Sequence, residues 1–441
     1  MAAAPRPWGR ALAWLLFLGP FFFASYGFAT WVTGQRAQVG VVVFDWERHI
    51  PFLPWTILPY WLIDGLYGLS LFLCADRARL DTHARRLLTA QLLAVACFLL
   101  FPLRFSFERP PVEGLPGALF DLLGQFDRPF NQAPSLHIAL MVLLWGVYLR
   151  ALPRPWHGLV HGLFALIGVS VLTTWQHHFI DVPTGLALGA LCLWLWPDDR
   201  PSPLARPALA ADPARRRLGG LYLLGALACV GLAGTGGGAL WLLWPAGSLA
   251  LVGAAYLVLG SAAFQKGPDG RPSPAALGLL APYLAGAWLN SRAWTRGLAP
   301  AVEIRPGLWL GRLPTAADLE RLGIAAIVDL GAELPCPTGG RAYANVPMLD
   351  LVAPEPDAID TARRAIQAAR ARGPVLVCCA LGFSRSALAV AAWLLAEGHA
   401  PAPEIAVEQV RRVRPGVVLG PAQRQALAAW WAGARAVGGR P

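Results

Sequence analysis

The chain has 441 residues, of which 56% are hydrophobic and 14% are charged. Soluble proteins of this length usually carry about a quarter charged residues, so the composition excludes a soluble globular protein and predicts one that crosses a membrane several times. The formal net charge of +11 does not indicate nucleic-acid binding, because the arginines lie in short loops between apolar segments, where they anchor the chain against anionic lipid.

Apolar segments fill the first part of the chain. A helix needs roughly 20 apolar residues to span a bilayer. We predict an all-α polytopic bundle of six spans in residues 1–197, near 11–32, 52–75, 88–103, 134–151, 157–174 and 183–197. A Pro/Ala/Arg-rich linker at 198–217 then leads to a two-span hairpin at 218–263, which contains no charged residue.

The distribution of arginine predicts the topology. Loops on the side of the N-terminus carry most of the positive charge, which places the N-terminus of this multi-pass protein in the cytosol. A connecting and interfacial segment, 264–299, follows the hairpin, and its stretch 275–290 could span, re-enter or lie along the surface. With eight spans the C-terminal region is cytosolic, and with nine it is exported. We favour the cytosol, because a reactive thiol beside a second cysteine would be oxidised outside.

Titratable residues cluster in two segments of the six-span region. PFNQAPSLHIAL contains His137, and TTWQHHFIDVPTG contains His177 and Asp181. His177 and Asp181 are four residues apart, so on a helical turn Asp181 can hold one ring nitrogen and leave the other as a nucleophile towards phosphorus. His137 could protonate the leaving alkoxide or activate the incoming hydroxyl. The predicted topology places both histidines on the outer face.

These two segments resemble the second and third signatures of the type 2 phosphatidic acid phosphatase superfamily. PSLH stands for PSGH and HHFIDVPTG for the end of the third signature, while FDWERHIPFLPW and PYWLID look most like the branch with inositol phosphorylceramide synthases. The resemblance covers roughly 40–197 and implies a lipid phosphatase or a lipid headgroup transferase. Because Val171 replaces the usual arginine after Ser170, Arg104 and Arg109, with Arg128 in reserve, are the cations left to bind phosphate.

The C-terminal region, 300–441, alternates short strand-like and helix-like segments, which predicts a small α/β domain with a central sheet flanked by helices. Within it, VLVCCALGFSRSALAVAAWLL runs from a buried strand through a loop into a buried helix. Loop amides at a helix N-terminus bind an anion, and Gly382 lets the backbone come close. Arg385 would clamp two phosphate oxygens, Ser386 would hydrogen-bond the sulfur or phosphate, and the same field favours the nucleophilic thiolate of Cys379.

This segment resembles the C-x-x-G-x-x-R-S signature of cysteine-based tyrosine and dual-specificity phosphatases. The family implies a cysteinyl-phosphate intermediate and an upstream aspartate that protonates the leaving oxygen, here Asp350, with Asp357 in reserve. It also implies that VEIRPGLWLG is a first strand and AAIVDLGAE a second. Cys378 stands where the family has a histidine. If Cys378 has no role of its own, Cys378→His should raise activity at neutral pH by favouring the thiolate.

The sequence therefore predicts a bifunctional integral-membrane phosphatase of the cell inner or plasma membrane. Its substrates would be a membrane lipid or a phosphoprotein, and the uncharged loop residues between Cys379 and Arg385 argue against highly phosphorylated inositol lipids. The seven cysteines show no disulfide or zinc spacing, and we expect no cofactor, no metal and no nucleic acid. A lipid phospho-headgroup transferase with a regulatory phosphatase domain, an inactive membrane scaffold, and any oligomeric state remain open.

Overall fold

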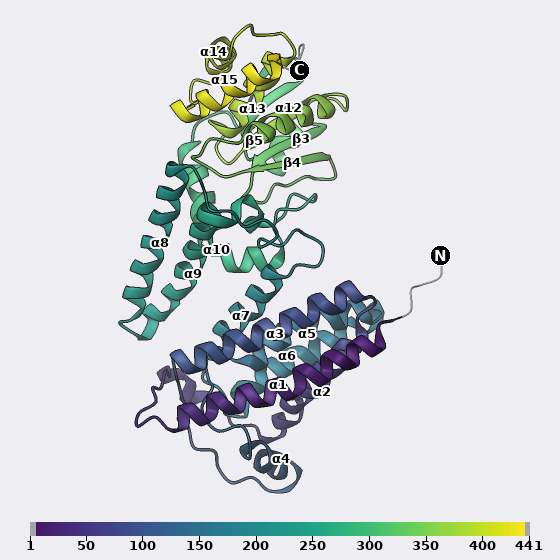
Figure 1. Cartoon of the computed structure of the whole chain (residues 1–441), viewed down its shortest axis with the longest axis vertical. Coiled ribbons are helices and arrows are strands. Elements are labelled where there is room, and N and C mark those ends of the chain that lie inside the picture. Colours follow the sequence, from purple (N-terminus) through teal and green to yellow (C-terminus); the bar gives the residue numbers. More distant parts are fainter. Residues whose placement is uncertain (1–5, 437–441) are drawn as a thin grey trace. The chain divides into compact units, whose positions relative to one another are not determined.

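The computed structural model describes residues 6–436 and divides into two compact units, Met1–Asp199 and Arg200–Pro441 (Figure 1). The boundary falls inside the predicted linker, 198–217. The last residues of that linker are helical, because Pro213 begins a helix that Asp212 caps through its side chain.

The first unit is a helical bundle. Its α-helices are α1 (Trp8–Gly34), α2 (Ile57–Leu73), α3 (Arg77–Leu100), α4 (Gly114–Gly124), α5 (Leu136–Ala151), α6 (His157–Thr173) and α7 (Asp181–Leu195). Three short 3₁₀ turns also belong to it, η1 (Asp45–His49), η2 (Pro54–Thr56) and η3 (Arg154–Trp156). Buried apolar side chains from α1 to α7 form one continuous core.

Within residues 6–436, six helical segments are long and apolar enough to cross a membrane: Trp8–Gly34, Pro54–Leu73, Arg77–Leu100, Arg154–Thr173, Pro213–Ala233 and Gly237–Phe264. The predicted spans at 134–151 and 183–197 correspond to α5 and α7, which have only 16 and 15 residues. At 1.5 Å per residue each is about 23 Å long, less than the ~30 Å hydrocarbon core. The count of eight spans stays a prediction.

Helices α5 and α7 approach closely because α7 presents glycine where they meet. A Cβ added at Gly185 would lie 2.6 Å from the carbonyl oxygen of Ser135, and one at Gly189 would lie 2.7 Å from Cβ of Val142. Small residues at such a contact let two backbones approach. The packing brings the first turns of the two helices together, and these turns carry His137 and Asp181.

The second unit begins with a helical layer. It comprises α8 (Pro213–Ala233), η4 (Gly237–Leu242), α9 (Leu243–Ala254), the π-turn η5 (Ala255–Leu259), η6 (Gly260–Phe264) and α10 (Pro274–Trp294). Gly219 of α8 lies against Leu257, where an added Cβ would approach Cγ to 2.6 Å, so the two arms of the hairpin pack tightly. The uncertain stretch 275–290 lies within α10, which runs as one helix through Pro282.

The α/β domain has a five-stranded mixed sheet in the order β1-β2-β5-β3-β4. Its strands are β1 (Ala301–Arg305), β2 (Leu308–Arg312), β3 (Ala326–Gly331), β4 (Ala342–Met348) and β5 (Val375–Cys379). Only β1 and β2 are antiparallel. Its helices are α11 (Ala316–Arg321), α12 (Pro356–Arg370), α13 (Arg385–Ala396), α14 (Pro403–Val413) and α15 (Pro421–Ala436).

The predicted α/β domain with a central sheet is confirmed, with one correction. VEIRPGLWLG was expected to be a single strand, but it forms the hairpin of β1 and β2. Pro306 and Gly307 make the turn, and Gly307 has the positive φ (+75°) that glycine adopts without strain. The central strand β5 and every residue of α13 are buried, so the loop that joins them is held from both ends.

Candidate functional site

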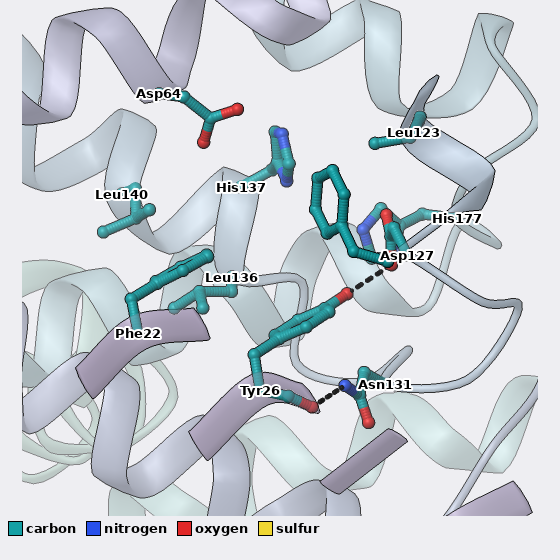
Figure 2. Close-up of a pocket in the computed structure, with 11 residues that line it drawn as sticks. Phe22, Tyr26, Asp64, Leu123, Asp127, Asn131, Leu136, His137, Leu140 and His177 are labelled. Carbon is teal, nitrogen blue, oxygen red and sulfur yellow. Dashed lines mark hydrogen bonds between the residues drawn. The ribbon is translucent and has the colours of Figure 1, made fainter. Parts of the chain in front are cut away.

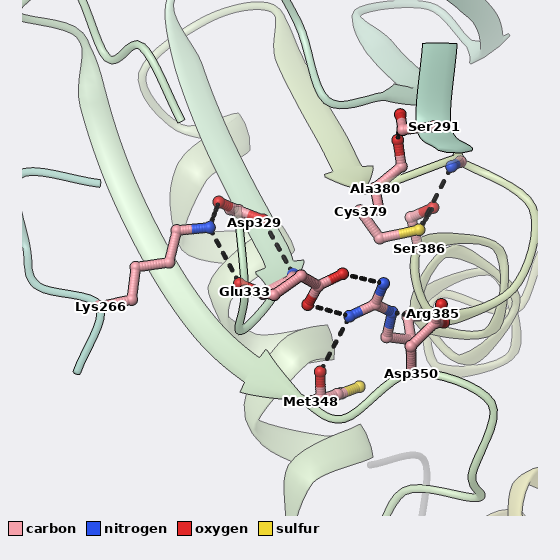
Figure 3. A network of polar contacts seen from close by, with 12 residues as sticks. Lys266, Ser291, Asp329, Glu333, Met348, Asp350, Cys379, Ala380, Arg385 and Ser386 are labelled. Carbon is pink, nitrogen blue, oxygen red and sulfur yellow. Dashed lines mark hydrogen bonds and ion pairs between the residues drawn. The ribbon is translucent and has the colours of Figure 1, made fainter. Parts of the chain in front are cut away.

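The loop between β5 and α13 closes around the thiol of Cys379. The sulfur is buried, accepts a hydrogen bond from the amide of Gly382 at 3.3 Å, and lies 3.3 Å from Oγ of Ser386 (Figure 3). Strand β5 ends at the nucleophile and α13 begins at Arg385, so the loop amides gather at the N-terminus of a helix. The structure thus brings together the four residues of the predicted signature.

Gly382 is required by the packing of this loop. Its φ is +76°, and an added Cβ would lie 2.4 Å from the carbonyl carbon and oxygen of Gly311 on β2. Any side chain would collide with strand backbone, which cannot move aside. The loop therefore has one conformation that the sheet itself enforces.

Arg414 holds the outer side of the same loop, a role that the sequence did not reveal. Its Nε donates to the carbonyl of Gly382 at 3.0 Å and its Nη2 to that of Leu381 at 3.4 Å. The guanidinium also lies over the ring of Phe383. Because two loop carbonyls point to Arg414, the N–H groups on the opposite side of the loop are free to face a phosphate.

Arg385 is held by a buried carboxylate that the sequence analysis also missed. Its Nη2 and Nη1 donate to Glu333 at 2.7 and 2.8 Å, and Nη1 also donates to the carbonyl of Met348 at 3.0 Å (Figure 3). Burial by itself lowers the pKa of Arg385, but the charges of Glu333 and Asp350 outweigh it and hold that pKa well above its ordinary value. The guanidinium is therefore a fixed cation.

The hydrogen bonds of Arg385 leave donors for the expected bidentate contact with a phosphate. Glu333 accepts one N–H from each terminal nitrogen and the carbonyl of Met348 accepts the second from Nη1, whereas the second N–H of Nη2 and the N–H of the buried Nε have no hydrogen-bond partner among residues 6–436. Nε lies 3.2 Å from Oδ1 of Asp350, without the geometry of a hydrogen bond. In this state Nε and Nη2 each keep one N–H for a phosphate oxygen, and Asp350 is the group that a phosphate would displace from Nε.

Asp350 lies in the loop after β4, and the structure places it at the site. Its backbone carbonyl accepts a hydrogen bond from the hydroxyl of Tyr256 at 3.0 Å. The next residue, Leu351, is exposed and has a φ of +60°, a strained conformation for a leucine. Asp357, the reserve candidate, lies exposed in the first turn of α12 and makes no contact with Cys379 or Arg385 in the described chain.

A comparison with protein families identifies this region. Residues 308–432 match the family model described as "Dual specificity phosphatase, catalytic domain". These residues form a dual-specificity phosphatase catalytic domain. The chain is therefore a phosphatase, and the matched range lies wholly within the second unit.

Solved structures similar to the phosphatase domain include human DUSP28, at 27% identity over 31% of this chain and 96% of that chain, with a TM-score of 0.29. A mouse putative dual specificity phosphatase complexed with zinc tungstate matches at 26% identity over 32% of this chain and 92% of that chain, with a TM-score of 0.30. PTPMT1 in complex with PI(5)P matches at 20% identity over 32% of this chain and 100% of that chain, with a TM-score of 0.30.

Cys378 points away from the phosphatase loop into a buried polar cluster. Its thiol, that of Cys336 and a carboxylate oxygen of Asp329 lie within 4.8 Å of one another. A hydrogen bond with Cys336, together with burial, raises the pKa of Cys378 well above its ordinary value. Lys266 donates to Asp329 at 2.5 Å and to the carbonyl of Gly331 at 2.9 Å. A neutral thiol and a carboxylate already paired with a lysine do not fit a metal site.

The first unit brings the predicted histidines together. His177 Nδ1 lies 3.0 Å from Oδ2 of Asp181. The ring centroids of His177 and His137 are 6.4 Å apart, and Figure 2 shows both rings. His137 stacks on Tyr60 at 3.9 Å, and its Nε2 is buried without a partner in the described chain. Both rings line a cavity of about 20 Å³, enough for one water molecule.

Two acidic residues at this cavity were not found from the sequence. Asp64 and Asp127 line it, and Asp127 accepts a hydrogen bond from Tyr26 at 2.7 Å (Figure 2). Burial raises the pKa of Asp127, which lies in the loop before α5. No local pattern marks these residues, because each depends on the packing of helices distant in sequence.

Of the two predicted phosphate-binding arginines, Arg109 lies within electrostatic range of the histidine cavity. Both arginines are exposed, and the guanidinium of Arg109 interacts electrostatically with Tyr60, which stacks on His137, and with Asp127, which lines the cavity. The guanidinium of Arg109 lies 5.0 Å from the ring centre of Phe120. Their role in binding phosphate stays a prediction.

Proposed function

We propose that this chain is a bifunctional integral-membrane phosphatase. A cysteine site in the phosphatase domain hydrolyses phosphate monoesters of a lipid or a phosphoprotein, and a histidine site in the first unit acts on lipid phosphate on the outer face. The observation that carries the cysteine site is the meeting of Cys379, Arg385 and Asp350 around one loop. The close pair of His177 and Asp181 beside His137 supports the second site.

At the cysteine site, the sulfur of Cys379 attacks phosphorus and the bond to the ester oxygen breaks. Asp350 gives its proton to that oxygen, so the leaving group departs as a neutral alcohol. The loop amides and Arg385 hold the phosphoryl oxygens throughout. Water then attacks the cysteinyl phosphate, Asp350 takes its proton, and the thiolate returns with release of inorganic phosphate.

At the histidine site, the Nδ1–H of His177 donates to the carboxylate of Asp181, which leaves Nε2 as the nucleophile. Attack on phosphorus breaks the ester bond, and His137 supplies the proton to the leaving alkoxide. Water releases the phosphate in a second step. The structure supports the pairing, because His137 Nε2 is buried and unpartnered in the described chain and faces the same small cavity.

The test is release of phosphate from a water-soluble aryl phosphate by the full-length protein. We expect Cys379→Ser to abolish it and His177→Ala to leave it unchanged, which assigns the activity to the cysteine site and excludes a scaffold. Loss of activity in His177→Ala with full activity in Cys379→Ser would reverse the assignment. Protease accessibility of the C-terminal domain in sealed vesicles tests its proposed cytosolic side.

A lipid phospho-headgroup transferase is the second candidate for the first unit. Val171 stands after Ser170 where the resembling superfamily usually has a phosphate-binding arginine, so one cation expected of a phosphomonoesterase is missing from the first unit. A new phosphodiester product, rather than free phosphate, made by the Cys379→Ser protein would decide for it.

A further inference from the structure

A cavity of about 440 Å³ connects the helical layer of the second unit to the phosphatase loop. Its helical side includes Tyr222 of α8, Leu249 of α9, and Tyr283 and Gly286 of α10. Its other side includes Asp350 and Ala380, the residue directly after Cys379. The volume lies in the range of small-molecule binding sites, ~300–1,000 Å³.

Specific hydrogen bonds fasten the helical layer to the catalytic loops. The hydroxyl of Ser291, buried at the end of α10, donates to the carbonyl of Ala380 at 2.6 Å (Figure 3). The hydroxyl of Tyr256 donates to the carbonyl of Asp350 at 3.0 Å. One helical hydroxyl thus holds the nucleophile loop and another holds the acid loop. The cavity between them is part of the site.

The outer surface of the same helices carries apolar side chains that no other described residue covers. Leu224 and Leu227 of α8 are 62% and 66% exposed, and both α8 and 237–264 are long and apolar enough to cross a membrane. Side chains of this kind face lipid in a membrane helix. The cavity therefore begins among helices suited to the bilayer and ends beside the nucleophile.

The charges that line the cavity restrict what can enter. Its only charged lining residues among those described are Glu333 and Asp350, both acidic, and no lysine or arginine lines it. Additional phosphates on a headgroup would be repelled there, because no cation pairs with them. Aromatic and aliphatic side chains on the helical side match a hydrocarbon chain.

We propose that this cavity takes the acyl chain of a membrane lipid that carries a single phosphate monoester and delivers that phosphate to Cys379. The proposal rests on the proposed function of the cysteine site and names its substrate class. Cys379 sulfur forms the bond to phosphorus, the bond to the lipid oxygen breaks, and Asp350 supplies the proton to the lipid alcohol. Water later releases phosphate, so no other reactant is needed.

The experiment compares three phosphate monoesters with the full-length His177→Ala protein in mixed micelles: a long-chain monoacylglycerol phosphate, glycerol 3-phosphate and a phosphotyrosyl peptide. An aryl phosphate reports the cysteine chemistry alone. We expect kcat/KM for the lipid to exceed that for glycerol 3-phosphate by about a hundredfold or more, because each buried methylene is worth about 0.8 kcal/mol.

A matched pair of variants tests the cavity itself. An added Cβ at Gly286 or at Gly278 meets no atom within 4 Å, and both glycines lie on α10, but only Gly286 lines the cavity. We expect Gly286→Leu to lower the ratio of lipid to aryl phosphate kcat/KM about tenfold and Gly278→Leu to leave it unchanged. Ala287→Leu, from another lining position, serves if Gly286→Leu does not fold.

The outcomes separate the two proposals. Two results would refute the lipid cavity while leaving the cysteine phosphatase intact, provided that aryl phosphate is hydrolysed through Cys379. One is a kcat/KM for the peptide equal to that for the lipid. The other is the same ratio of lipid to aryl phosphate kcat/KM in both glycine variants. If aryl phosphate is not hydrolysed, the proposed function fails and this inference fails with it. A lipid preference that Gly286→Leu lowers about tenfold and Gly278→Leu leaves unchanged supports both proposals.

Discussion

Replacing Glu333 with glutamine would test how Arg385 is held at the site. The change keeps the shape of the side chain but removes the charge that pairs with the guanidinium at 2.7 and 2.8 Å. Glu333 is 4% exposed and Arg385 3%, so water cannot replace the lost partner. Breaking a buried ion pair from one side costs about 3–5 kcal/mol. We expect the lower end, about 3 kcal/mol, because Asp350 and the carbonyl of Met348 remain beside Arg385.

The assay is thermal unfolding of the full-length protein together with aryl phosphate kinetics. For a unit of this size, about 3 kcal/mol lowers the Tm by roughly 6–12 °C. A misplaced guanidinium should also lower kcat/KM by about a hundredfold. Glu397→Gln, at an exposed position, is the control and should change stability by less than about 0.5 kcal/mol. Equal Tm and kcat/KM in the two variants would refute the role of the pair.

The pH dependence of unfolding gives an independent check of the same pair. Burial alone would raise the pKa of Glu333, but the charge and hydrogen bonds of Arg385 hold it below its ordinary value. A carboxyl with a lowered folded-state pKa stabilises the protein above its unfolded pKa, about 4.3, and that contribution is lost as the pH falls through the folded value. The wild type should therefore lose more stability than Glu333→Gln below about pH 4.

Three further changes probe the loop and its supports. Gly382→Ala should destabilise the second unit by about 3 kcal/mol or more in thermal unfolding, because its Cβ would collide with Gly311. The control Gly307→Ala, which has a similar φ but open space around it, should cost about 1 kcal/mol. Equal effects of the two variants would contradict the packing argument. Arg414→Ala should lower kcat for aryl phosphate about tenfold or more with partial rescue by Arg414→Lys, and an unchanged kcat would remove its positioning role. Cys378→His should lower activity at neutral pH and lower the free energy of unfolding by about 1–3 kcal/mol, since Cys378 is fully buried beside Cys336. Cys378→Ser should lower the free energy of unfolding by less. A gain in activity for Cys378→His would restore the expectation from the sequence.

Local chemistry explains which parts of the cysteine site the sequence predicts. Cys379, Gly382, Arg385 and Ser386 lie within eight residues, and their roles follow from one strand, one tight loop and one helix start. Glu333 and Arg414 lie far from them in sequence, and their bonds to the loop exist only because β3 and the end of α14 are brought there by the sheet. Residues that come into contact only through the order of strands in the sheet have no fixed spacing in the sequence, so no local motif reveals them.

The same reasoning applies to the first unit. His177 and Asp181 are four residues apart on one turn, and that local pair is present in the structure. His137 reaches them through the glycine contact of α5 with α7, which no periodicity in the sequence shows. Asp64 and Asp127 come from other helices and loops and carry no local signal.

The helices before residue 300 are bonded directly to the catalytic loops of the phosphatase domain. A domain boundary placed at residue 300 would separate these helices from the site that they support. Tyr256 and Ser291 bond the acid loop and the nucleophile loop, and Lys266 forms a buried ion pair with Asp329 on β3. A buried pair costs several kcal/mol of desolvation per ion, so it persists only where the two segments are fixed together. The hairpin and α10 therefore do more than tether a catalytic domain, because they form one wall of the cavity beside its nucleophile loop.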